Sequence, residues 1–254
     1  MAERKRGTVV YSARSISKHY GPITACDAVD LDIRAGEILA IVGDNGAGKT
    51  TLVKILSGAL QPDAGRLLRN GAEISLSSTR DAHRQGIEVV YQELALAPNL
   101  DVVSNVFLGR EIAWKPGFLP YPRILMRRKM IDLASSELAR LDVAIPAVSG
   151  IPVGRLSGGQ RQSVAIARSA YWASDILFMD EPTAALGVKE SQAVLRLIRK
   201  VADNGVAVVM VSHAMPHVVS LADRVVVMRH GQKVADQPAN EITVEALVKL
   251  IVGV

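Results

Sequence analysis

The sequence predicts an α/β fold: a core sheet that holds a glycine-rich loop, preceded by an antiparallel β subdomain and interrupted by an inserted α-helical subdomain. Three observations carry this prediction. An apolar run at 38–42 breaks into a glycine-rich loop and continues with the apolar spacing of a helix. A second short apolar run, at 176–180, ends in two acidic residues. Between these runs, residues 94–155 lose the strand pattern and change to helices and loops.

Composition excludes several classes of protein. A chain of 254 residues with 49% hydrophobic and 22% charged residues is an ordinary globular protein of one or two domains, so disordered and fibrous classes are excluded. The net charge of +5 favours a mildly basic, solvated surface over a nucleic-acid or membrane-binding patch, and 4% aromatic residues argue against a base-stacking platform. Cys26 is the single cysteine, so no internal disulfide forms. No run approaches the roughly 20 apolar residues of a membrane span, so we expect a soluble, cytosolic protein.

The loop at 43–51 reads GDNGAGKTT and contains the G-x-x-x-x-G-K-[ST] pattern in its required setting, between a strand and a helix. Glycines let the backbone wrap a phosphate with its N–H groups pointing inward, and the helix N-terminus favours an anion. We expect Lys49 to reach the β- and γ-phosphates and the Thr50 hydroxyl to bind Mg²⁺. A glycine-rich turn before Lys-Thr by chance is the alternative, which the flanking strand and helix disfavour. The predicted nucleotide-binding residues here are Gly43, Asp44, Asn45, Gly46, Ala47, Gly48, Lys49, Thr50 and Thr51.

The segment before this loop alternates as strands do. Residues 8–18 and 24–33 are predicted strands, joined by a Gly-Pro turn at 21–22. Tyr20 lies just before this turn, where its ring is a candidate to stack on a purine. Tyrosines are common at strand ends, so a purely structural role is an equal alternative.

Shorter elements follow the first helix. Residues 66–75 are predicted to form a hairpin around an Asn-Gly pair. Ser77 or Ser78 can cap a short helix after it. A strand at 87–91 then ends directly before Gln92.

The insertion is predicted to contain helices at 102–108 and 127–141, before the string LSGGQRQ at 156–162. Ser157 is a natural N-cap for the helix that follows, and two glycines come next, so this helix N-terminus can also face an anion. The alternative is an ordinary cap whose glycines allow close packing. The start of this helix and the residues before it are Leu156, Ser157, Gly158, Gly159 and Gln160.

Two further strands end in polar residues that suit catalysis. The run at 176–180 ends in Asp180, which can hold Mg²⁺ through water, and Glu181, which can orient or deprotonate a water molecule. The alternative is a pair of turn residues before a proline. His213 follows a strand at 206–211, and parallel sheets bind ligands at the carboxyl ends of their strands. We therefore expect His213 to contact the γ-phosphate and the attacking water.

The remaining elements complete the predicted core. Residues 188–204 have amphipathic helical spacing, and an Asn-Gly pair ends that helix. Residues 225–229 and 233–234 are predicted edge strands, and residues 243–252 a last helix.

Together these motifs resemble those of the nucleotide-binding subunits of ABC transporters, over nearly the whole chain. Residues 43–51 resemble the Walker A motif of that family and residues 176–180 its Walker B motif. The string at 156–162 is similar to the family's signature, which discriminates it from other NTPases. Tyr20 corresponds to the adenine-stacking aromatic, and Gln92 to the Q-loop glutamine.

The resemblance also implies roles and assembly. Glu181 corresponds to the catalytic glutamate, His213 to the switch histidine, and Mg²⁺ is expected at Thr50, Gln92 and Asp180. ATP would be bound in a head-to-tail homodimer, where the signature of one copy closes over the phosphate loop of the other.

The family's organisation implies one nucleotide-binding domain over 1–254. Residues 1–92 and 172–254 would form the RecA-like core with the β subdomain, and 93–171 the α-helical subdomain. The part of it at 93–155 normally docks a membrane permease, at the cytoplasmic face of a bacterial inner membrane, and a periplasmic sugar-binding protein takes part indirectly.

A finer resemblance is to monosaccharide importers of the ribose, xylose and fructose kind, above all to single-cassette ATP subunits of fructose importers. It rests on VYQEL at 90–94, NVFLGRE at 105–111 and EPTAALGVKE at 181–190. Two departures stand out: Gly187 replaces an aspartate of the general family, and many relatives fuse two cassettes where this chain has one Walker A motif.

Other functions stay open from the sequence. A soluble ABC-type ATPase acting on ribosomes or DNA is disfavoured, because such proteins usually carry two cassettes or long coiled-coil insertions; nucleic acid is therefore not an expected partner. An export-type cassette is a further alternative. A nucleotide-sensing regulator without turnover is disfavoured because Lys49, Asp180, Glu181 and His213 are all present.

Overall fold

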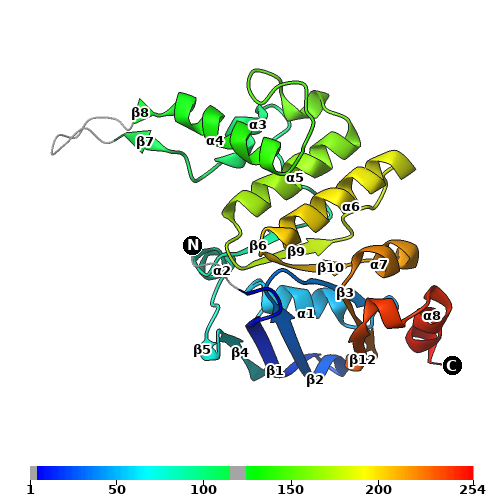
Figure 1. Ribbon diagram of the computed structural model, residues 1–254. Coiled ribbons are helices and arrows are strands. Elements are labelled where there is room, and N and C mark those ends of the chain that lie inside the picture. Colours follow the sequence, from blue (N-terminus) through cyan, green and yellow to red (C-terminus); the bar gives the residue numbers. More distant parts are fainter. Residues whose placement is uncertain (1–4, 115–123, 254) are drawn as a thin grey trace.

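In a computed structural model that describes residues 5–114 and 124–253, the core is a six-stranded sheet in the order β12-β11-β3-β10-β9-β6 (Figure 1). Neighbouring strands from β11 to β6 are parallel, and β12 runs antiparallel to β11. The strands are β3 (Ile38–Val42), β6 (Ile87–Val90), β9 (Ile176–Asp180), β10 (Ala207–Val211), β11 (Arg224–Arg229) and β12 (Gln232–Pro238). Strands buried on both faces read as continuous apolar runs, as β3 and β10 do.

The prediction that residues 225–229 form an edge strand is wrong. β11 lies between β12 and β3, and its residues from Arg224 to Met228 are buried. Only β12, with alternating exposed and half-buried residues, forms this edge of the sheet. The error arose because a strand's late place in the chain does not fix its place in a parallel sheet, where crossovers reorder the strands.

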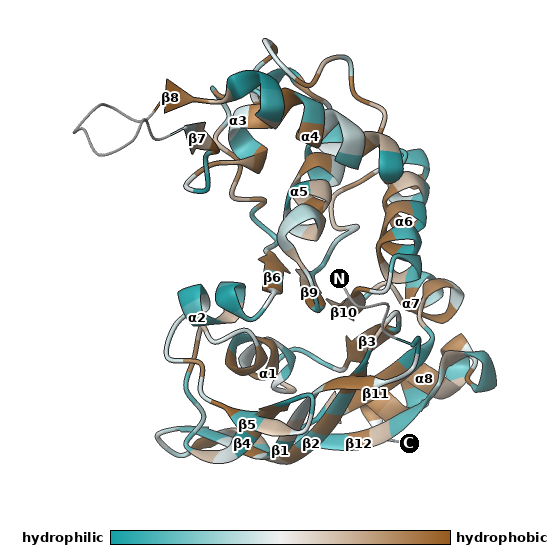
Figure 2. Ribbon diagram, turned by 60° about the vertical axis from the view of Figure 1, so that its left-hand side comes forward, coloured by the Kyte–Doolittle hydropathy of each residue, from teal (hydrophilic) through white to brown (hydrophobic). Residues whose placement is uncertain are grey.

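A second, antiparallel sheet forms the predicted N-terminal β subdomain. In the described residues it has the order β2-β1-β4-β5, and the strands are β1 (Val9–Tyr20), β2 (Ile23–Arg34), β4 (Ala64–Arg69) and β5 (Ala72–Ile74). Helix α1 (Lys49–Leu56) lies between this sheet and the core sheet (Figure 2). The predicted strands and the hairpin at 66–75 are confirmed, with longer strands on both sides of the first turn.

Alternate residues of β3 face two different cores. Leu39 and Ile41 pack with α1 and the antiparallel sheet, whereas Ile38, Ala40 and Val42 pack with the helices on the opposite face. The helices packed there include α5 (Gly158–Trp172) and α6 (Val188–Asp203), through their apolar stripes. The core sheet is therefore covered on both faces, which fixes the strand that leads into the phosphate loop.

The other helices confirm or extend the predictions. Ser78 caps α2 (Thr79–Arg84), and the helices predicted at 102–108 and 127–141 are α3 (Val102–Val106) and α4 (Arg127–Arg140). Thr243 caps α8 (Val244–Val252). The sequence analysis did not predict α7 (Met215–Leu221), the 3₁₀ turns η1 (Val153–Arg155) and η2 (Ala239–Glu241), or the short strands β7 (Ala113–Trp114) and β8 (Ile124–Leu125).

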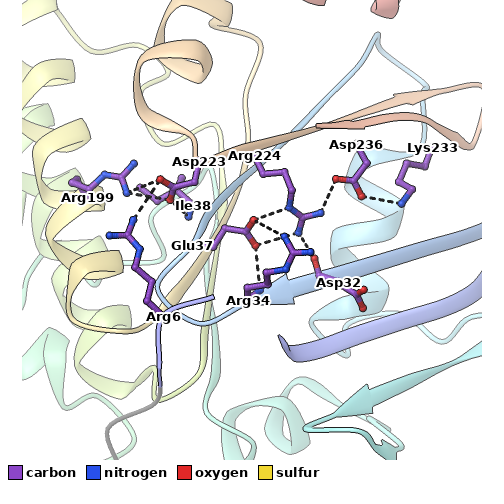
Figure 3. A network of polar contacts seen from close by, with 10 residues as sticks. All are labelled: Arg6, Asp32, Arg34, Glu37, Ile38, Arg199, Asp223, Arg224, Lys233 and Asp236. Carbon is purple, nitrogen blue, oxygen red and sulfur yellow. Dashed lines mark hydrogen bonds and ion pairs between the residues drawn. The ribbon is translucent and has the colours of Figure 1, made fainter. Parts of the chain in front are cut away.

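A polar network ties the start of β3 to neighbouring elements (Figure 3). Asp223, just before β11, accepts a hydrogen bond from the backbone N–H of Ile38 at 2.8 Å and two from Arg199 of α6 at 3.1 and 3.2 Å. Because charge-assisted hydrogen bonds are the strong ones, Asp223 anchors β3, β11 and α6 to each other. In the part of the chain that the structure describes, no helix combines the length and apolar character that crossing a bilayer requires.

Candidate nucleotide-binding site

The glycine-rich loop occupies the turn between β3 and α1, and two of its glycines are dictated by their surroundings. Gly43 has φ +150°, and a Cβ there would lie 2.2 Å from the carbonyl oxygen of Met228. At Gly48, with φ +99°, a Cβ would lie 2.1 Å from the carbonyl oxygen of Ala25. Gly46 differs, because no atom lies within 4 Å of the place where its Cβ would be. The loop is thus packed at both ends and open in its middle.

Lys49 begins α1 and is 6% exposed. Its Nζ donates hydrogen bonds of 2.8 Å to the carbonyl oxygens of Gly43 and Asp44, so the side chain folds back across the loop. Burial lowers the pKa of the Lys49 ammonium, against the opposing effect of nearby carboxylates that include Glu181. A partly desolvated cation beside an open loop favours an anionic ligand.

Glu181 follows β9 in a left-handed backbone conformation, with φ +50°. Its N–H donates to the carbonyl of Val211 in the neighbouring strand β10 at 3.0 Å, which holds the turn at the end of the sheet. Burial raises the pKa of the Glu181 carboxyl, and the charge of His213 opposes this effect. A carboxylate with a raised pKa is a better proton acceptor.

His213 lies against this carboxylate. Its Nε2 is 3.5 Å from Glu181 Oε1, and its backbone N–H donates to Glu181 Oε2 at 3.4 Å. Oε1 is buried and accepts no hydrogen bond from the described residues. An unsatisfied buried oxygen of this kind points to a ligand or water that completes the site.

One pocket of about 610 Å³ brings most of the predicted residues together. Its predicted lining residues are Tyr20, Asn45, Gly46, Ala47, Gly48, Lys49, Thr50, Thr51, Gln92, Asp180, Glu181 and His213. Tyr20 is 48% exposed there, so a face of its ring is available. Gly43 and Asp44 are outside the lining. The sequence analysis did not identify Ile23, Ala25, Ala184 and Val211, which also line the pocket and which no chemical motif marks.

The signature residues lie elsewhere in the chain's structure. Ser157 caps α5, as predicted, and forms a reciprocal capping box with Gln160: each side chain accepts from the other residue's backbone N–H, at 3.2 and 3.0 Å. Ser157, Gly159 and Gln160 line a different pocket, of about 380 Å³. Leu156 is buried at 4% exposure. Within one chain, therefore, the signature and the phosphate loop do not share a pocket.

Residues of the first pocket fit a nucleotide with a divalent cation. Thr50 supplies a hydroxyl, Gln92 an amide and Asp180 a carboxylate, all facing one pocket. Among residues 5–114 and 124–253 no cluster of three or more His, Cys, Asp or Glu residues could hold a metal ion by itself. This donor set suits Mg²⁺, which is commonly held by one or two carboxylates together with the phosphates of its ligand.

A buried strand that runs through a glycine-rich loop into a helix, with an acidic strand end beside it, defines a P-loop nucleotide-binding protein. The comparisons with known proteins narrow this class. A family model described as ABC transporter matches residues 26–184, and the chain belongs to that family. The predicted family is thus confirmed.

Curated relatives share most of the chain. A fructose import ATP-binding protein of Rhizobium meliloti, FrcA, is 44% identical, over 96% of this chain and 94% of its own length. A xylose/arabinose import ATP-binding protein of Sulfolobus acidocaldarius, XylG, is 39% identical, over 94% of this chain and 92% of its own. The ribose import ATP-binding protein RbsA of Rhodopirellula baltica is 39% identical over 96% of this chain, which spans only 46% of that relative.

Solved structures show the same fold. A nucleotide-free ATP-binding cassette from an ABC transporter superposes with a TM-score of 0.80 at 22% identity, over 97% of this chain and 96% of that one. A dimeric bacterial ABC transporter cassette superposes with a TM-score of 0.73 at 23% identity, over 91% and 99%. The α/β fold predicted from the sequence, that of ABC cassettes, is confirmed.

Proposed function

We propose that this chain binds and hydrolyses ATP to drive the import of a monosaccharide through a membrane permease. The observation that carries the proposal is the single pocket that unites the phosphate loop, the acidic end of β9 and His213. Support for a monosaccharide as the transported substrate comes from the relatives, which are named as fructose, xylose/arabinose and ribose import ATP-binding proteins. None of these three relatives is named as an exporter, so they do not support an export-type cassette.

The roles of the pocket residues follow from their chemistry. Tyr20 stacks on the adenine, and Lys49 exchanges its two loop carbonyls for the β- and γ-phosphates. Thr50, Gln92 and Asp180 would hold Mg²⁺, which would supply positive charge beside the phosphates. These residues bind and orient the nucleotide before any bond breaks.

Glu181 and His213 act on the attacking water. Glu181 Oε1 is buried and without a hydrogen bond in the described structure, so it accepts one from that water and receives its proton. Burial raises the pKa of Glu181, which makes its carboxylate a better proton acceptor. His213, 3.5 Å away, orients the carboxylate and donates to the γ-phosphate.

We further propose that two copies assemble head to tail. The signature at 156–160 lies outside the pocket of its own chain, so a second copy has to supply it. The N-terminus of α5 then faces the terminal phosphate with free N–H groups of the two glycines. We assign residues 1–92 and 172–254 to the core with its β subdomain and residues 93–171 to the α-helical subdomain, whose segment 93–155 contacts the permease.

We propose that the dimer lies at the cytoplasmic face of a bacterial inner membrane, next to the permease subunits. A periplasmic sugar-binding protein delivers the sugar to that permease and does not touch the cassette. Nucleic acid has no part in the mechanism.

Mixing two inactive variants tests the composite site. Lys49→Ala removes the phosphate contact and Ser157→Arg blocks the signature, so each variant alone has no intact site in its homodimer. A mixed dimer has one intact site, formed by Lys49 of one variant and Ser157 of the other. We expect ATPase activity to return on mixing; activity that stays absent, or a wild-type monomer that turns over ATP, contradicts the proposed dimer.

Transport and its alternative need a second experiment. Deleting the gene in its host is expected to abolish uptake of at least one of labelled fructose, xylose and ribose, and Glu181→Gln is expected not to restore it. Unchanged uptake of all three sugars, together with capture of ribosomes or DNA by the purified chain at physiological salt, would favour a soluble ABC-type ATPase instead.

A further inference from the structure

Thr183, in the turn after β9, contacts His217 on α7. Thr183 Oγ1 lies 3.2 Å from His217 Nδ1, a hydrogen-bond distance, and both residues are half-buried. The two residues are 34 positions apart, so the bond ties the turn to a separate helix. Thr183 belongs to the string EPTAALGVKE at 181–190, but the sequence analysis assigned no role to Thr183 or to His217.

The turn depends on its surroundings because its backbone is unusual. Glu181 has φ +50° and Ala185 has φ +57°, conformations that residues other than glycine keep only where neighbouring structure holds them. Backbone hydrogen bonds hold the first part of the turn, from Glu181 N to Val211 O and from Ala184 N to Glu181 O, both at 3.0 Å. The hydrogen bond between the side chains of Thr183 and His217 holds the same turn at a position between Glu181 and Ala184.

His213 and His217 contact the same turn at two points. His213 lies against Glu181, and His217 lies against Thr183 two residues further along. One short segment, from the end of β10 into α7, therefore contacts both the Glu181 carboxylate and the side chain of Thr183 in the same turn. Helix α7 packs in turn against α6, α8 and η2, so its position is set by the protein core.

We infer that His217 is a positioning residue: through Thr183 it holds the turn in the conformation that aims the Glu181 carboxylate into the nucleotide pocket. The inference rests on the proposed role of Glu181. Neither Thr183 nor His217 lines that pocket, so breaking their bond leaves the nucleotide contacts in place. Turnover then falls while nucleotide affinity stays the same.

Steady-state ATPase kinetics of the purified full chain test this assignment. Thr183→Val keeps the size of the side chain and removes its hydroxyl, and His217→Leu removes Nδ1. Each is expected to lower kcat about fivefold, the effect of one hydrogen bond, without changing KM for ATP. The double variant is expected to be no slower than either single one, since both changes break the same bond.

Conservative variants and controls separate positioning from stability. Thr183→Ser keeps the hydroxyl and His217→Asn keeps a polar atom near Nδ1, so both are expected to retain wild-type kcat. Ser220→Ala, which removes a different hydrogen bond on α7, serves as the matched control and is expected to change nothing.

Several outcomes would overturn the inference. One is a wild-type kcat for both Thr183→Val and His217→Leu, and another is an additive loss of kcat in the double variant. A rise in KM as large as the loss in kcat would also contradict it, as would a loss of activity in Thr183→Ser and His217→Asn. Glu181→Gln is measured in the same assay. If it turns over normally the proposed function fails as well, whereas slow turnover of Glu181→Gln beside normal Thr183→Val refutes only the role of His217.

Discussion

Arg224 binds Glu37 in the protein interior through two hydrogen bonds, of 2.6 Å from Nε and 3.1 Å from Nη2 (Figure 3). The residues are 187 positions apart, and both side chains are about nine-tenths buried. Arg224 also donates to Asp236 of β12 at 2.7 Å and to the carbonyl of Asp32 in β2. Through the Asp32 carbonyl, Arg224 therefore joins the core sheet to the antiparallel sheet, beside the strand that leads into the phosphate loop.

Replacing only Arg224 of the Arg224–Glu37 ion pair is expected to destabilise the folded protein. Arg224→Met removes both hydrogen bonds that Arg224 donates to the buried Glu37 carboxylate and leaves it only Arg34, whose Nη1 lies 3.8 Å from Glu37 Oε1. We expect the free energy of unfolding to fall by about 3 kcal/mol. Urea unfolding followed by circular dichroism measures this loss. The double variant Arg224→Met/Glu37→Met leaves no unpaired charge and is expected to recover much of the stability; equal losses in the single and double variants would contradict this account.

Glu181→Gln is expected to leave ATP binding intact and to slow hydrolysis by about a hundredfold or more, since the amide cannot accept a proton from water. Phosphate release measures the rate, and equilibrium titration with a fluorescent ATP analogue measures binding. Because ATP then persists, the variant is also expected to elute as a dimer in gel filtration with ATP. Glu93→Gln, an exposed residue outside the pocket, is the matched control. Unchanged turnover would remove Glu181 from its assigned role.

Two glycines of the loop give a matched pair for stability. Gly48→Ala places a methyl group against the carbonyl of Ala25. In Gly46→Ala the methyl group meets no atom within 4 Å, and the only cost is the positive φ of +82°, which is unfavourable for alanine. We expect Gly46→Ala to cost about 1 kcal/mol and Gly48→Ala clearly more, since the backbone there has to move. Thermal unfolding without nucleotide compares the two directly. Equal losses would mean that the contact with Ala25 does not constrain the loop.

Asp101, the N-cap of α3, is expected to stabilise the fold in a pH-dependent way. Burial raises the pKa of its carboxyl, but hydrogen bonds from Ser104 and Gly150 and the charge of Arg127 outweigh this and lower the pKa to about 2. The folded state thus holds the proton less tightly than the unfolded state. The stabilisation, of about 2 kcal/mol, is present near neutral pH and is lost as the pH falls from about 4 to 2.

Asp101→Asn tests that expectation. The variant is expected to be less stable than the wild type at pH 7, and the difference is expected to shrink as the pH approaches 2, where the carboxyl of the wild type becomes protonated. Urea unfolding across this pH range measures it. A difference in stability that stays constant down to pH 2 would show that the charge of Asp101 contributes nothing.

Much of the site followed from local sequence. The residues of the phosphate loop, Asp180, Glu181 and His213 all stand at strand ends, and the period of the apolar residues located those strands. Parallel strands bring their carboxyl ends to one edge, so the prediction that these side chains meet required no knowledge of strand order.

What the sequence analysis could not supply depends on contacts between distant segments. β11 was predicted at an edge because strand order depends on crossovers. Helix α7 was not predicted because it is short and its N-cap, Ala214, has no side chain that could mark the start of a helix. The contacts Arg224–Glu37 and His217–Thr183 could not be predicted for a similar reason. A charged or polar residue acquires a partner only when folding brings another element beside it.

By itself, the sequence determined the class of the protein, the loop that holds a phosphate and the chemical groups around it, because glycine spacing, helix caps and apolar period are local properties. Only the tertiary structure decided how those groups are held: Glu181 in a left-handed turn against His213, Gly48 against a carbonyl of another strand, and the signature in a pocket apart from the phosphate loop. The physical reason is that burial, close approach and hydrogen-bond partners are set by packing between elements far apart in the chain.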